Sequence, residues 1–121
     1  MQEMEVAAHR FVRSRLRQTI LVRRLAFFAV ALRRRTIDLV GLLDERYGLG
    51  YFEDDDYCMR ANEQGVKMVI ADDVFIHHHL SVSFSTLGAQ AGELMKKNRA
   101  LFEERWGAWE PHRYRDEPGF G

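Results

Sequence analysis

Three observations in the sequence predict a mixed α/β domain with an incomplete sheet. Residues 3–17 and 89–106 carry apolar side chains at the three- and four-residue spacing of helices. Residues 25–32 and 66–70 are short apolar runs of the kind that form buried strands. No predicted strand is followed by a glycine-rich phosphate loop and a helix. Because so few strands are predicted, we expect this domain to form part of a larger sheet with flanking helices.

Local signals place the remaining elements. Thr36 can cap a short helix, and Gly65 fits the position just after a helix that begins at the acidic run. Gly107 ends the last helix. Periodicity alone leaves a buried helix open for the run at 25–32. The expected order is helix 3–17, strand 25–32, helix 36–43, loop 44–52, helix 53–64, strand 66–70, turn 72–73, apolar run 74–77, loop 81–88 and helix 89–106.

These elements divide the chain into three expected parts and fit a small globular protein. The parts are a basic N-terminal helix in 1–24, one domain in 25–110 and an irregular tail in 111–121. Of the 121 residues, 46% are apolar and 30% are charged, which excludes a disordered chain. Cys58 is the only cysteine, so no internal disulfide is expected and a reducing compartment fits. No apolar stretch is long enough for a membrane span or a secretory signal.

Charge is unevenly distributed along a chain whose net charge is zero. Residues 1–35 contain nine arginines and two glutamates, a balance of +7, and residues 36–121 carry the opposite −7. A basic segment can contact anionic lipid, nucleic acid or phosphate. The alternative is a solvated helix face that pairs with the acidic half of this chain or of a second copy. We expect no nucleic-acid partner, because aromatic residues are not interleaved with the arginines on one face.

Residues 53–56 are four consecutive carboxylates that follow an aromatic pair at 51–52. An acidic neighbour raises the proton affinity of a carboxylate, which helps a general base to act near neutral pH. Asp56 and Arg60 are four residues apart and can pair on one helix face. That pairing would leave the first two carboxylates freer for chemistry. An ordinary acidic helix start is the alternative.

Three histidines, His77 to His79, end the apolar run at 74–77. On a strand, His77 and His79 share a face and are candidate ligands for a divalent metal. The alternative is a set of polar residues that face solvent. Cys58 lies at a helix position that can be buried, which favours a structural role.

Trp106 and Trp109 flank Gly107 near the end of the last helix. Their large apolar rings favour a role as hydrophobic anchors over a platform for a sugar.

Six parts of the chain, taken in order, point to a family. They are residues 28–34, 40–48, 50–60, Gly65, 73–79 and 98–107. Together they resemble the C-terminal half of family-two glycosyltransferases of the GT-A fold, over residues 25–107. The resemblance implies a partial GT-A-like mixed sheet with flanking helices that lacks the family's N-terminal nucleotide-binding half.

The resemblance implies an inverting transfer of a sugar from a nucleotide-sugar to an acceptor hydroxyl. In the family's Glu-Asp-x-Asp motif the first Asp is the catalytic base, which falls on Asp54 here. Glu53 and Asp56 fall on acceptor-binding positions. Tyr51 and Phe52 would exclude water that could hydrolyse the donor.

The family also implies a divalent metal, Mn²⁺ or Mg²⁺, at the donor diphosphate. His77 is the best match for its histidine ligand, and His79 is second. Leu80 replaces the family's glycine after the histidines. The donor half and its Asp-x-Asp motif have no counterpart here, so we expect a truncated or split enzyme that is inactive alone and binds metal only when a donor site is completed.

The resemblance further implies partners and a location. They are a nucleotide-sugar, a glycan or lipid-linked acceptor, and either a second copy or a missing N-terminal half, in surface-polysaccharide synthesis in the cytoplasm, with peripheral contact at the inner face of the membrane. Two alternatives remain open. One is a non-catalytic α/β module that self-associates through its open sheet edge. The other is a metal hydrolase built from histidine and aspartate.

Overall fold

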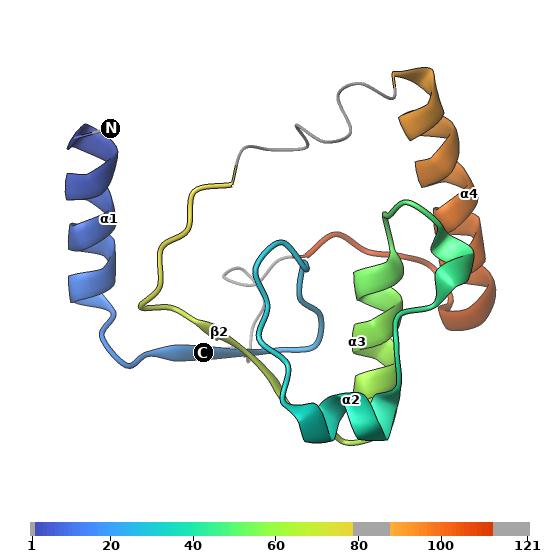
Figure 1. Cartoon of the computed structure of the whole chain (residues 1–121), viewed down its shortest axis with the longest axis horizontal. Coiled ribbons are helices and arrows are strands. Elements are labelled where there is room, and N and C mark those ends of the chain that lie inside the picture. Colours follow the sequence, from blue (N-terminus) through green and yellow to red (C-terminus); the bar gives the residue numbers. More distant parts are fainter. Residues whose placement is uncertain (1, 79–87, 113–121) are drawn as a thin grey trace.

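The computed structural model describes residues 2–78 and 88–112, which form helices around a small sheet (Figure 1). Mixed helix and strand content agrees with the predicted α/β class. α1 lies at one end of the molecule, α4 lies at the other, and α3 lies between the sheet and α4. In chain order the elements are α1 (Gln2–Ser14), β1 (Thr19–Val22), α2 (Arg34–Val40), the 3₁₀ turn η1 (Glu45–Tyr47), α3 (Glu53–Glu63), β2 (Met68–Ala71) and α4 (Ala89–Trp106).

The sheet that the structure describes is one antiparallel pair, β1 with β2. Val22 pairs with Met68, and these two side chains are buried on the inner face. Leu21 pairs with Val69, and both remain about half exposed on the outer face, at 48% and 49%. β1 lies within the segment 1–24, so this segment contributes a strand to the domain as well as a helix.

The apolar core lies between the sheet and α3. It consists of Val22 and Met68 from the strands and Cys58 and Ala61 from the helix. These two helix residues are three apart, so they share one face of α3. Burial raises the pKa of the Cys58 thiol to about 12, and the thiol therefore stays protonated and unreactive. The structural role predicted for Cys58 agrees with this burial.

The strand predicted at 25–32 is wrong, because the first strand ends at Val22 and an irregular loop follows. The cause is tertiary. The backbone N–H of Leu25 donates to Cys58 Sγ at 3.2 Å, and the N–H of Phe27 donates to an Asp54 carboxylate oxygen at 3.1 Å. Side chains of α3 thus occupy backbone donors that a strand would use for a neighbouring strand.

Three further segments differ from the prediction. α2 begins at Arg34 rather than after a Thr36 cap, since the Thr36 N–H already donates to the Arg33 carbonyl. The apolar run at 74–77 has no regular secondary structure. The first helix ends at Ser14 rather than near residue 17.

The other predicted elements are present. α3 ends at Glu63, with Gly65 just beyond it at a φ of 74°, a conformation that favours glycine. Gly107 follows α4 and donates its N–H to the carbonyl of Glu103, as a helix stop does. Most of the loop expected at 81–88 lies outside the described residues.

Candidate functional site

The approach to α3 is a strained turn. Tyr51 and Phe52 have φ values of 68° and 69°, in the left-handed region that bulky residues rarely adopt. Such residues cost free energy and persist only where surrounding contacts hold them. This turn delivers the acidic run directly to the first turn of α3, where helix amide groups favour negative charge.

A buried asparagine of α4 holds that turn. Asn98 has no exposed surface, and its Nδ2 lies 2.7, 2.5 and 3.0 Å from the carbonyl oxygens of Tyr47, Gly50 and Tyr51. This role of Asn98 was not predicted from the sequence. A signal was available, because Asn98 stands four residues before the buried Phe102 and therefore lies on the inner face of α4.

Asp56 is completely buried and surrounded by donors. Its carboxylate accepts from Arg60 Nε at 3.0 Å and from Trp106 Nε1 at 2.8 Å, and an Arg105 nitrogen lies 3.6 Å away. The predicted pairing of Asp56 with Arg60 is confirmed. Arg60 also donates to the carbonyl of Leu42 at 2.8 Å, so this cluster ties α3 to the chain after α2 and to the end of α4.

Asp55 is held in a similar way on another side of the helix. Trp109 Nε1 donates to it at 2.5 Å, His112 Nε2 lies 2.6 Å from its other oxygen, and an Arg24 nitrogen is 3.7 Å away. Trp106 and Trp109 were predicted as hydrophobic anchors. Each of them also donates its indole N–H to a carboxylate of α3.

Glu53 and Asp54 have a different environment. Both are partly exposed, and no ion pair joins either one to a cation in the described part of the chain. Asp54 accepts from the N–H groups of Phe27, at 3.1 Å, and of Asp55, at 2.8 Å. One Glu53 oxygen is buried without a hydrogen-bond partner.

Partial burial sets the proton affinity of this pair. It raises the pKa of Asp54, against the opposing effect of its two backbone donors. It also raises the pKa of Glu53. A partly exposed carboxylate with a raised pKa can accept a proton from a bound hydroxyl group. Glu53 and Asp54 therefore combine partial exposure with a raised pKa.

The aromatic pair lies beside these groups. The Phe52 ring packs against Phe102 at 6.0 Å and against Trp109 at 5.4 Å between ring centroids, so it joins α3 to α4. Tyr51 is partly exposed next to it. Both residues lie at the N-terminal end of α3, which is the end that carries Glu53 and Asp54.

Of the histidine run at 77–79, the described members His77 and His78 do not join the carboxylate cluster of α3. His78 stacks on Phe28 with ring centroids 5.0 Å apart, and His77 is exposed. His79, the second predicted ligand, lies outside the described residues, as does Leu80. Among residues 2–78 and 88–112, no three histidine, cysteine or acidic side chains lie close enough to hold a metal ion.

Comparisons with protein-family models, with curated proteins and with solved structures found no match to this chain. Within the described residues, none of the helices combines the length and apolar character needed to cross a bilayer.

Proposed function

We propose that this chain is the acceptor side of an inverting glycosyltransferase, with Asp54 as the catalytic base. The observation that carries the proposal is the division of the acidic run. Asp55 and Asp56 are buried and held by tryptophan and arginine donors, whereas Glu53 and Asp54 are partly exposed without an ion pair in the described chain. The family resemblance over residues 25–107 supplies the reaction class.

In this mechanism Asp54 accepts the proton of the acceptor hydroxyl while the hydroxyl oxygen attacks the anomeric carbon. The bond from that carbon to the diphosphate oxygen breaks, and the sugar configuration inverts. Burial raises the pKa of Asp54 and so strengthens it as a base. Glu53 accepts hydrogen bonds from the acceptor. Asp56 has no exposed surface to offer an acceptor and serves as the anchor of this turn.

The donor side of the reaction comes from outside the described residues in this proposal. It consists of the nucleotide-sugar, a divalent metal and the residues that bind both, contributed by a nucleotide-binding half or by another chain. The reaction would belong to surface-polysaccharide synthesis in the cytoplasm, and its acceptor would be a glycan or a lipid-linked glycan. No step of the acceptor-side mechanism passes through the metal.

A glycan array tests the acceptor side without a donor. The purified chain is applied to the array, and each bound glycan is then titrated by calorimetry against wild type, Asp54→Asn and Asp38→Asn. Asp38 is the matched control, because it is an exposed carboxylate paired with Arg34 on α2. We expect binding that Asp54→Asn weakens and Asp38→Asn does not. Absence of glycan binding, or equal effects of the two variants, would contradict the proposal.

The donor side has its own test. UDP and dTDP are titrated into the chain with and without Mn²⁺, and we expect no binding to the isolated chain. Sugar transfer by the isolated chain would show that it assembles a donor site by itself, which would contradict the proposed division between acceptor and donor sides.

The sheet favours a second candidate function, a module that self-associates. β1 and β2 form only one antiparallel pair among the described residues, and Leu21 and Val69 remain half exposed on its outer face. Strand edges of this kind can pair with another chain. Sedimentation of wild type and Leu21→Asp tests this function: a dimer that the substitution dissociates, without glycan binding, would favour it over the transferase.

A further inference from the structure

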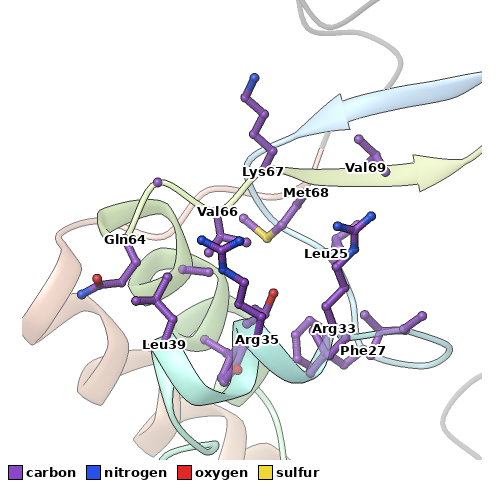
Figure 2. Close-up of a pocket in the computed structure, with 17 residues that line it drawn as sticks. Leu25, Phe27, Arg33, Arg35, Leu39, Gln64, Val66, Lys67, Met68 and Val69 are labelled. Carbon is purple, nitrogen blue, oxygen red and sulfur yellow. The ribbon is translucent and has the colours of Figure 1, made fainter.

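A cleft of about 660 Å³ lies between α2, the loop after β1 and the start of β2 (Figure 2). Its walls come from the loop after β1, from α2, from the C-terminal end of α3 and from β2. The apolar side chains that Figure 2 labels around it are Leu25, Phe27, Leu39, Val66, Met68 and Val69. This volume lies within the usual range of sites for small organic ligands.

Three cations line the same cleft. Arg33 and Arg35 extend from the start of α2 along the apolar wall, and Lys67 stands just before β2 (Figure 2). Among residues 2–78 and 88–112, the lining contains no aspartate or glutamate. Within the described residues, none of the three cations has an ion pair, whereas the intervening Arg34 pairs with Asp38 on the outside of the helix. The cleft therefore combines an apolar wall with uncompensated positive charge.

We propose that this cleft binds a single-chain amphiphile with a phosphate head group. The guanidinium groups of Arg33 and Arg35 offer forked N–H donors that suit phosphate oxygens. The apolar wall would remove a hydrocarbon chain from water. This inference rests on the cleft alone and holds whether or not Asp54 is a base.

The lining argues against other occupants. A neutral sugar needs several polar side chains around it. Among the described lining residues only three uncharged side chains are polar, those of Thr36, Tyr57 and Gln64. A nucleic acid would need aromatic faces for stacking, whereas aliphatic side chains make up most of this wall. A phosphate with one hydrocarbon chain matches both parts of the cleft.

Calorimetric titration with decyl phosphate, below the concentration at which it forms micelles, tests the site. We expect binding to one site per chain. The double variant Arg33→Gln/Arg35→Gln should weaken it by about tenfold or more. The matched control is Arg10→Gln/Arg13→Gln, which removes two exposed arginines of α1 outside the cleft. Leu39→Asp, at an exposed position of α2, should also abolish binding by placing a negative charge in the wall.

Circular dichroism and urea unfolding of each variant show that the fold is retained, and the exposed positions of Arg33, Arg35 and Leu39 make this the expected result. Several results would overturn the proposal. Three concern the ligand: no binding of decyl phosphate, equal binding of decyl maltoside or of inorganic phosphate alone, and binding only to phosphatidylglycerol vesicles. Two concern the variants: an equal loss of binding in the α1 control, and a dimer that the Arg33/Arg35 variant dissociates without a change in decyl phosphate binding.

Discussion

The two halves of the acidic run occupy opposite environments within a single helical turn. Asp55 and Asp56 are buried, at 4% and 0% exposure, and together they meet two indole N–H groups, three arginines and a histidine. Glu53 and Asp54 face partly outward, and within the described residues Asp54 accepts only from backbone N–H groups. Successive carboxylates of a helix point in different directions, so one turn can serve two purposes.

The difference shows how a cluster of like charges is maintained. Adjacent carboxylates repel one another, and here two of them are neutralised by donors from α4, its following residues and the loop after β1. These contacts thereby hold α3 against α4 and against the loop after β1. The remaining two carboxylates keep partly exposed surfaces at a fixed position, which is the arrangement that a general base requires.

The largest expected effect comes from removing the buried carboxylate of Asp56. Asp56→Ala leaves the Arg60 and Arg105 charges and the Trp106 indole without their acceptor. We expect a loss of roughly 3–5 kcal/mol in the free energy of unfolding, measured by urea titration. Asp54→Ala, the matched control two positions earlier in the acidic run, should cost only about 1 kcal/mol. Equal losses would contradict the division of the run.

Asn98→Ala removes the amide that holds the turn before α3. We expect a loss of roughly 1–3 kcal/mol, because carbonyl groups of the turn lose a buried donor. Hydrogen exchange should rise at residues 47–52 before it rises in the core. Asn62→Ala is the control, since within the described chain Asn62 donates to one carbonyl, that of Arg23. A smaller loss for Asn98→Ala than for Asn62→Ala would refute the assigned role.

Trp109→Phe keeps an aromatic ring beside Phe52 and removes the hydrogen bond to Asp55. We expect a loss of about 1 kcal/mol in unfolding experiments. In a Trp109→Phe/Asp55→Asn double-mutant cycle the two losses should not add, because both residues belong to one hydrogen bond. Strict additivity would show that the indole N–H contributes nothing through Asp55.

The smallest expected effect is a change in pH dependence at Glu53. Burial raises the pKa of Glu53 in the folded chain, so the unfolded state releases this proton more readily. Stability should therefore fall as pH rises above the ordinary value of 4.5. Glu53→Gln removes this titration, and the contribution that falls as pH rises above 4.5 should disappear. An unchanged or steeper pH profile in the variant would contradict the burial of Glu53.

Features of the fold that depend on near neighbours in the sequence were predictable. The Asp56–Arg60 pair follows from a spacing of four, and the ends of α3 and α4 follow from Gly65 and Gly107. The burial of Cys58 follows from its place on an apolar helix face. The partners in the Asp56–Arg60 pair and at the two helix ends lie within one or two turns of one another, so pattern alone identifies them.

Features that depend on distant partners were not predictable. The run at 25–32 has the composition of a strand, but Cys58 and Asp54 take its backbone donors and leave it as a loop. The bond from Trp109 to Asp55 joins residues 54 positions apart. The cleft charges are likewise visible only when the start of α2 and β2 are placed side by side.

The central claim, that Asp54 is the carboxylate available to accept a proton, can be tested by NMR. Carboxyl carbon shifts are followed against pH in the intact chain, with Asp54→Asn to assign the signal. The account predicts a midpoint for Asp54 above its ordinary value of 3.8, because burial outweighs its backbone donors. A midpoint at or below 3.8 would place Asp54 among the purely structural carboxylates and would contradict its role as a base.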